Sequence, residues 1–187
     1  MILKEFEKVD YLGTRIADIF RPLSFYSSEI DSAFVYNQYT LRGNQQSETL
    51  AYALGGNPEL SWINLHINGV VDPFWGWVNN ENDIRKLAIR RYDNADSVHH
   101  YIDPQTNDEW YDLVEEPTNS AQYYDIGDTT FTRIVFTGLL IPITNYEYEI
   151  EINEGKRNIN LLPSQSFLSY DSSMKQVIEG SVDVDQE

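Results

Sequence analysis

The chain has 187 residues and no cysteine, and its thirty Asp and Glu against thirteen Lys and Arg give a formal net charge of −17. The length suits one domain or two small ones, and the lack of cysteine excludes a disulfide scaffold, a thiol nucleophile and cysteine-ligated zinc. Because such an acidic chain repels phosphate backbones, we expect no nucleic-acid partner. No run reaches the roughly 18 apolar residues of a membrane span, so we expect no membrane partner either.

The acidic residues are concentrated in the middle of the chain. Residues 1–91 hold 11 acidic and 9 basic side chains, whereas residues 92–154 hold 14 acidic ones and a single base, Arg133. This change predicts a boundary near Tyr92. We therefore predict an N-terminal arm over residues 1–35, a compact unit with a following helix over 36–91, and an acidic, strand-rich region over 92–187.

The first elements in chain order are a strand and two helices. Residues 36–42 are β-branched and aromatic, which favours a short strand. Ser47 then predicts a helix that ends at Gly55–Gly56, because glycine takes the left-handed conformation without steric cost. Asn57–Pro58 predicts a second helix directly afterwards, with Asn as its N-cap and Pro at its first position. This helix ends at Asn68–Gly69.

We predict a loop and a short strand over residues 70–78, and a third helix that begins at Asn79 or Asn80 with Ile84, Leu87 and Ala88 on its inner face. From here the apolar period changes from helical to alternating. Alternation predicts a hairpin from residues 97–102 and 109–114, and further strands at 129–137 and 146–152. Residues 163–178 predict a closing helix. The elements together indicate an α+β fold.

Aromatic residues after the second helix are the most informative local feature. Phe74, Trp75 and Trp77 occupy three of four consecutive positions, so on an extended segment they cannot all face the interior. They can serve as core residues, as a stacking platform for sugars, or as anchors for a protein partner. We predict Phe20, Trp75 and Trp77 as partner-interface residues, and we assign Leu60 and Trp62 to the core.

Catalytic and metal sites find little support. His99, His100 and Asp103 form one cluster, but adjacent strand residues point to opposite faces, so we predict surface hairpin residues and no metal site. No nucleophile or nucleotide-binding motif is present. The carboxylates are numerous enough for a glycosidase, yet none is distinguished as acid or base. We expect no enzymatic activity and no cofactor. The candidate carboxylates are Glu115, Glu116, Asp125, Asp128, Glu147, Glu149 and Glu151.

Several segments taken in order resemble the small baseplate wedge protein family of contractile-tailed (myovirus) bacteriophages. The resemblance runs from about Ile16 to Leu113, and its most specific part is G-N-P-x-L-x-W followed by D-P-F-W-G-W. The segments are DIFR at 18–21, YTLRG at 39–43, ETLAYALGGNPELSW at 48–62, DPFWGW at 72–77 and WYDL at 110–113.

The resemblance implies a structural virion protein of the tail baseplate, assembled in the host cytoplasm. It would join wedge subunits and help close the baseplate ring around the hub, with other wedge proteins and neighbouring wedges as its partners. The family's middle region is similar to a LysM fold, a β-α-α-β unit, and the strand-helix-helix-strand order predicted over residues 36–78 agrees with it. The alternative is a LysM-type module that binds peptidoglycan or another carbohydrate, with residues 43–46 and 68–70 at its sugar site.

Overall fold

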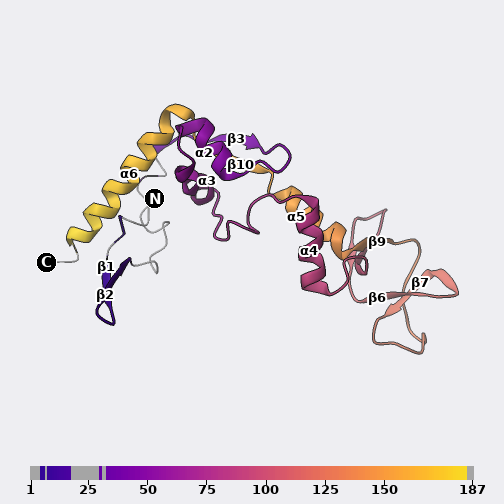
Figure 1. The fold of residues 1–187 in the computed structure, drawn as a ribbon. Coiled ribbons are helices and arrows are strands. Elements are labelled where there is room, and N and C mark those ends of the chain that lie inside the picture. The colour runs from indigo at the N-terminus through magenta and orange to yellow at the C-terminus, as the bar shows by residue number, and fades with distance from the viewer. Residues whose placement is uncertain (1–4, 7, 18–29, 31–32, 185–187) are drawn as a thin grey trace. The chain divides into compact units, whose positions relative to one another are not determined.

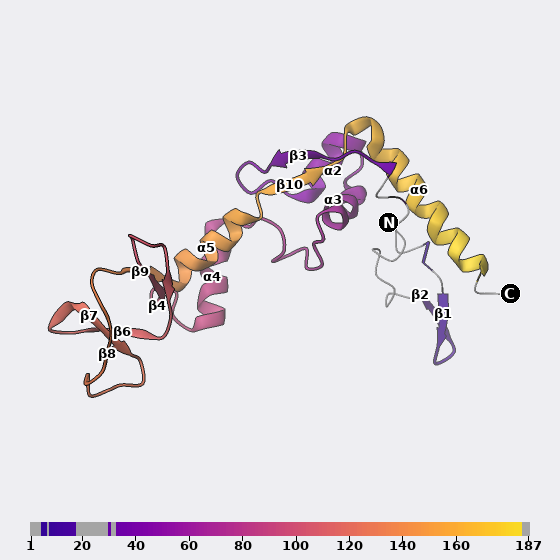
Figure 2. The same ribbon diagram turned by 180° about the vertical axis from the view of Figure 1, so that it is seen from behind.

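The computed structural model describes residues 5–6, 8–17, 30 and 33–184. Its two compact units are shown in Figures 1 and 2. Unit 1 combines Met1–Asn79 with Gly155–Glu187, and unit 2 is Asn80–Glu154. Both helices and strands are present, which confirms the predicted α+β class. Within the described residues no helix combines the length and apolarity needed to span a bilayer.

The helices of unit 1 begin and end close to the predicted residues. Helix α2 (Ser47–Gly55) stops where Gly56 takes φ 70° and its N–H donates to the carbonyl of Tyr52. Asn57 Oδ1 then accepts from the Glu59 N–H at 3.0 Å and starts the 3₁₀ turn η3 (Pro58–Leu60). This turn leads directly into α3 (Ser61–Ile67). The Gly-Gly-Asn-Pro sequence is therefore a helix stop followed by a helix start, as predicted.

Unit 1 contains a two-stranded sheet from distant parts of the chain. Strand β3 (Asn37–Thr40) pairs antiparallel with β10 (Asn158–Leu161). The amide of Asn68 joins α3 to this sheet, since its Nδ2 donates to the Asn160 carbonyl at 2.9 Å and its Oδ1 accepts from the Asn160 N–H at 2.7 Å. Residues 70–78 form turns, so the prediction of a strand there is wrong. The partner of the first strand is supplied by β10 instead.

The core of unit 1 consists of two apolar clusters. Helix α6 (Ser164–Val184) confirms the predicted closing helix, and its buried face packs on α2, η3 and α3. The first cluster contains Phe6, Ile30, Ala51, Leu60, Ile63, Leu162, Phe167, Tyr170, Met174 and Ile178. The second contains Leu41, Leu50, Trp77, Val78, Ile159 and Leu161. Both clusters need side chains from residues 159–178, so the end of the chain is an integral part of unit 1.

The N-terminal arm predicted over residues 1–35 lies largely outside the described residues. Its described part contains a hairpin of β1 (Lys8–Tyr11) and β2 (Thr14–Ala17). The turn residues Leu12 and Gly13 both have positive φ, at 49° and 79°, as two-residue hairpin loops require.

Two helices of unit 2 lie side by side in both views (Figures 1 and 2). Helix α4 (Glu81–Tyr92) begins at Asn80, whose Oδ1 accepts from the Asp83 N–H at 3.0 Å. Helix α5 spans Asn145–Gly155. It includes residues 146–152, so the prediction of a strand there is wrong. Thr144 and Glu147 explain the difference, since each side chain accepts from the other's backbone N–H, at 3.2 and 2.8 Å. This reciprocal capping box starts a helix despite the alternating sequence.

Unit 2 also contains two three-stranded sheets. The first has the order β5-β4-β9, and the pairing of β4 with β5 confirms the predicted hairpin. The second has the order β6-β7-β8. Tyr101 of the first sheet, Tyr123 of the second and Leu140 form the buried cluster of the strand region. The strand predicted over residues 109–114 is divided at Asp112, which takes φ 54°. The strands are β4 (Val98–Ile102), β5 (Glu109–Trp110), β6 (Leu113–Glu116), β7 (Asn119–Asp125), β8 (Ile134–Thr137) and β9 (Ile141–Thr144).

The units differ from the divisions predicted from charge. Helix α4 belongs to unit 2 because it contacts α5: Arg91 Nη1 lies 2.8 Å from Glu149 Oε1, and Asn145 Nδ2 donates to the Asn94 carbonyl at 2.8 Å. Residues 155–187 return to unit 1 through the pairing of β10. Unit 2 holds sixteen Asp and Glu and five Lys and Arg, a formal net charge of −11.

Neighbouring residues on α6 test the role of the chain end in unit 1. Phe167→Ala removes a ring with no exposed surface from the first cluster and should lower the free energy of unfolding by about 3 to 5 kcal/mol. Leu168→Ala, at a side chain that is 56% exposed, is the matched control and should change it by less than about 0.5 kcal/mol. Urea unfolding of the full chain measures both. Equal effects would contradict this account of the core.

Candidate partner interface

A hydrogen-bonded turn at residues 70–77 carries three of the predicted aromatic residues, and we name it the aromatic turn. Asp72 organises it: its Oδ1 accepts from the Phe74 N–H at 2.9 Å and the Trp75 N–H at 3.3 Å, and its carbonyl accepts from the Gly76 N–H at 2.7 Å. A Cβ at Gly76 would lie 2.6 Å from the Asp72 carbonyl oxygen, so the turn requires glycine there. Lys156 Nζ donates to the Trp75 carbonyl at 2.6 Å. The turn is therefore fixed by its own hydrogen bonds to Asp72 and by the hydrogen bond from Lys156.

The predicted interface residues occupy different environments. Trp77 is 3% exposed, and its Nε1 donates to the Gln45 carbonyl at 2.9 Å, which makes it a core residue and corrects its assignment to the surface. Trp75 is half-buried, whereas Phe74 is 77% exposed at the tip of the same turn. Phe20 lies outside the described residues. Among the described aromatic residues of the turn, Phe74 and Trp75 have side chains that reach solvent.

The second feature lies in unit 2 and is the loop between β7 and β8, which is organised by Asp128. Asp128 Oδ1 accepts from the N–H and the hydroxyl of Thr130, at 3.1 and 2.8 Å. Its Oδ2 accepts from the N–H groups of Thr132 and Arg133, at 3.0 and 2.9 Å. These bonds, led by the Thr130 hydroxyl, lower the pKa of Asp128 to about 2. Asp128 is thus an ionised structural carboxylate and a poor candidate for a general acid.

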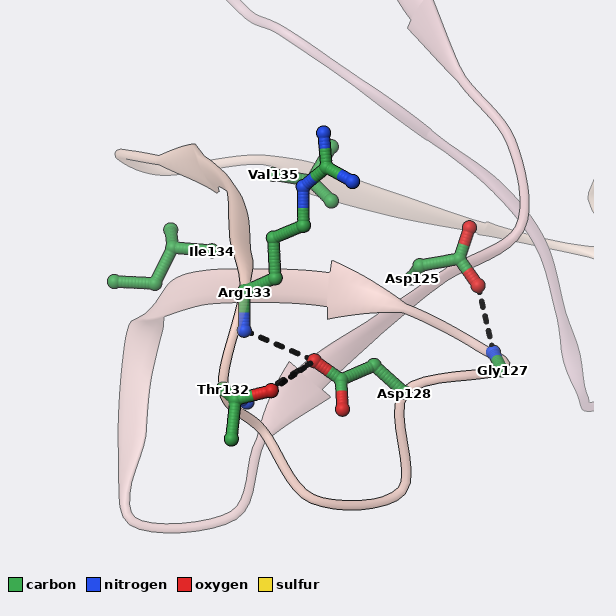
Figure 3. Close-up of a pocket in the computed structure, with 7 residues that line it drawn as sticks. All are labelled: Asp125, Gly127, Asp128, Thr132, Arg133, Ile134 and Val135. Atoms are coloured by element: carbon green, nitrogen blue, oxygen red, sulfur yellow. Dashed lines mark hydrogen bonds between the residues drawn. The ribbon is translucent and has the colours of Figure 1, made fainter.

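The loop borders a shallow depression of about 840 Å³, which we name the β8 surface. Figure 3 shows the Arg133 side chain extending away from Asp128, although its backbone N–H binds that carboxylate. Ile134 and Val135, both exposed, line the same depression as Arg133. Arg is enriched at protein interfaces, whose buried centres are apolar, so Arg133 with these two side chains is a candidate contact surface. The lining residues are Asp125, Gly127, Asp128, Thr132, Arg133, Ile134 and Val135.

The side chains of His99 and His100 contact each other, which corrects the prediction that they are surface residues on opposite faces of a strand. Val98 lies opposite Thr144 and His100 opposite Ile143, so His99 is an extra residue in β4, a β-bulge. The bulge breaks the alternation of side chains and brings the two imidazoles together, with 2.9 Å between their Nδ1 atoms. His100 is 3% exposed. Among the described residues no group of three or more His, Cys, Asp or Glu is arranged to hold a metal ion.

Sequence reasoning therefore missed two of the features that the structure assembles. Arg133 was visible as the one base in residues 92–154, and that isolation was a usable signal for the β8 surface. The contact of His99 with His100 had no such signal, because a one-residue bulge depends on the pairing of β4 with β9. The close spacing of Phe74, Trp75 and Trp77 could not show which of these rings is buried.

Comparisons with known proteins agree over nearly the whole chain. A family described as base plate wedge protein 53 matches residues 1–177. A similar protein is the baseplate wedge protein gp53 of Enterobacteria phage T4, which is 24% identical over 192 residues, with 97% of each chain covered. The match extends well past Leu113, where the resemblance in the sequence ended. The acidic strand region therefore lies within the matched length.

Titration of Asp128 tests the structure of the loop at the β8 surface. Because its folded-state pKa of about 2 lies below the unfolded value, the carboxylate contributes stability above about pH 4 and loses it as the pH falls towards 2. Carboxyl NMR of the full chain should show Asp128 ionised at pH 3. Asp128→Asn should speed amide exchange at Thr132 and Arg133. Asp125→Asn, whose carboxylate accepts from one loop amide, Gly127, is the control and should have a smaller effect. Titration of Asp128 near pH 4 would refute this account.

Proposed function

Because the chain belongs to the family of base plate wedge protein 53, we propose that it is a structural, non-enzymatic component of a phage tail baseplate wedge. The observation that carries the proposal is the family match over residues 1–177, supported by a T4 relative that covers 97% of the chain. The protein would be assembled in the host cytoplasm and carried in the virion. Its partners would be other wedge proteins and neighbouring wedges, and its role would be to join them and help close the ring around the hub.

The aromatic turn is the first surface we assign to a wedge partner. Phe74 and Val71 are exposed there, and Trp75 is half-buried. The Asp72 hydrogen bonds and the close approach at Gly76 already fix the backbone. Binding would therefore order few additional groups, which lowers its entropic cost. A partner for this turn would present an apolar pocket large enough for a phenylalanine ring.

Unit 2 carries the second surface that we assign to a partner, and its negative charge favours a basic partner. Its formal net charge is −11, and the β8 surface adds exposed Ile134 and Val135 with a single cation, Arg133. Such a unit would associate with a basic surface that also carries aliphatic residues. Long-range attraction of this kind speeds association and weakens as salt shortens the Debye length.

Carbohydrate binding by a LysM-like unit remains the alternative, and the hydrogen bonds of unit 1 do not favour it. The Gln45 carbonyl, in the first of the two segments considered for sugar, accepts from Trp77 Nε1. The Asn68 amide, in the second, binds the backbone of Asn160 and of Asn64. A sugar would have to compete with these bonds. Their use within unit 1 supports an assembly role over a free carbohydrate module.

Truncation of the aromatic turn tests the first surface. Phe74→Ala should weaken association with purified wedge proteins by roughly thirtyfold or more, the effect of losing a hot spot worth at least about 2 kcal/mol. Tyr52→Ala, which removes another exposed aromatic ring of unit 1, is the matched control and should bind as the parent does. Binding is measured by biolayer interferometry, with urea unfolding to show that both variants are folded. Parent-like binding by Phe74→Ala would remove this surface from the proposal.

Salt dependence tests the second surface separately. Association should weaken between about 50 and 500 mM NaCl, because the Debye length falls from more than 10 Å to a few ångströms. Arg133→Glu should weaken association by disrupting contact at the β8 surface. Arg90→Glu on α4 makes the same charge change elsewhere in unit 2 and is the matched control. Affinity that does not change with salt would contradict the electrostatic part. Retention on peptidoglycan without any binding to wedge proteins would favour the carbohydrate alternative.

A further inference from the structure

The contact between His99 and His100 is a hydrogen bond that restricts protonation. Their Nδ1 atoms lie 2.9 Å apart, so one ring must donate its Nδ1–H and the other must accept with a bare Nδ1. The geometry does not depend on which ring is the donor. It does require that the two neutral imidazoles have different tautomers. An isolated histidine on a surface hairpin has no such constraint.

Aromatic side chains from three elements enclose the pair. Tyr148 of α5 stacks on His99 with ring centroids 3.9 Å apart, and Tyr92 of α4 meets the same ring edge-on at 5.5 Å. Tyr111, directly after β5, stacks on His100 at 5.2 Å. The pair is therefore the point where the β5-β4-β9 sheet contacts the two helices of unit 2. Enclosure by rings also limits the hydration of an imidazolium ion.

Two of the carboxylates near the pair, Glu149 and Glu109, form hydrogen bonds with residues other than the two histidines. Glu149 of α5 is 2% exposed, and its Oε1 accepts from Arg91 Nη1 at 2.8 Å and from the Tyr92 hydroxyl at 3.2 Å, both on α4. Glu109 of β5 accepts from the Tyr111 hydroxyl. Asp112 lines the same small cavity as both histidines.

Burial is the largest influence on His99. Together with the neighbouring His100 it lowers the pKa of His99, against the raising effect of the Glu149 and Glu109 carboxylates. The nearby acids therefore do not compensate for burial of the ring.

The hydrogen bond between His99 and His100 can persist with one added proton but not with two. A first proton can go to the Nε2 of the donor ring, which leaves the hydrogen bond intact. A second proton can go only to the accepting Nδ1. It would place two N–H groups against each other at a 2.9 Å separation and put two like charges in contact. In the folded unit the neutral pair can therefore accept one additional proton, but not two.

We propose that the His99–His100 pair is an acid-sensitive switch in unit 2, which holds strand β4 against α5 while it carries at most one proton and weakens that contact when doubly protonated. In the unfolded chain both histidines take up a proton below about pH 6.5. The unfolded state then binds at least one more proton than the folded state, and the stability of unit 2 falls with the pH. The unfolding equilibrium constant of the unit should rise up to about tenfold for each pH unit below 6.5, for each extra proton.

Imidazole NMR of the full chain tests the geometry directly. Nitrogen shifts at neutral pH should show one of His99 and His100 as the Nδ1–H tautomer and the other as the Nε2–H tautomer. On acidification the two should titrate in coupled steps, the second well below pH 6.5. His66, the third histidine, lies in unit 1 and serves as the internal reference. Identical tautomers, or two independent titrations near pH 6.5, would overturn the proposal.

Stability measurements test the consequence for unit 2. Urea unfolding between pH 7.5 and 5.5, followed through amide signals of β4 and α5, should show roughly a tenfold rise in the unfolding constant of the parent. His99→Gln or His100→Gln should reduce that rise, and His66→Gln should retain it. Should both single variants fail to fold, the parent's pH dependence and tautomers still decide the matter. A pH-independent parent would refute the switch without affecting the proposed role in the baseplate.

Discussion

The antiparallel pairing of β3 with β10 is the constraint on which the rest of the structure depends. Thr40 and Asn158, which are hydrogen-bonded through their side chains, lie 118 positions apart. Closing a flexible loop of that length costs roughly 4 kcal/mol plus a constant. Unit 2 reduces this cost because its own contacts, such as Arg91 with Glu149, already bring α4 and α5 together. The insertion thus behaves as a folded connection and not as a long loop.

Completion of unit 1 depends on that return of the chain. Ile159 and Leu161 enter the second apolar cluster, while Leu162 and the buried face of α6 complete the first. Without them, the apolar faces of α2 and α3 would remain exposed to water. The hydrogen bonds from Asn68 to Asn160 fix the register between α3 and the returning strand. Sheet pairing and core packing in unit 1 are therefore coupled through residues 158–178.

Local signals in the sequence predicted the elements that depend on local chemistry. The stop at Gly56, the start at Asn57–Pro58 and the cap at Asn80 each involve contacts within a few residues, so their positions could be read from the sequence. Helix α5 was missed because Tyr or Ile alternates with Glu over residues 146–151, although the Thr144–Glu147 capping box was present in the sequence. That box should have outweighed the alternation.

The elements that could not be predicted depend on distant contacts. The partner of β3, the bulge at His99 and the burial of Trp77 all follow from pairing or packing with remote segments. Among the predicted interface residues, Trp75 and Trp77 were equivalent in sequence terms. The structure separates them because Gln45, thirty-two positions away, accepts the Trp77 indole N–H.

The two units differ in how they are stabilised, and this difference bears on partner binding. Unit 1 buries two large apolar clusters, whereas the strand region of unit 2 encloses Tyr101, Tyr123 and Leu140. Unit 2 also buries a polar contact, that of Glu149 with Arg91 and Tyr92, and its net charge of −11 adds self-repulsion. A basic partner would offset that repulsion and, by binding only the folded form, would raise the stability of the unit. In the proposed switch, a second proton on the histidine pair would destabilise the unit, and carboxylates neutralised by acid would attract a basic partner less. The same acidic residues would then link the folding of unit 2 to its assembly with a basic partner.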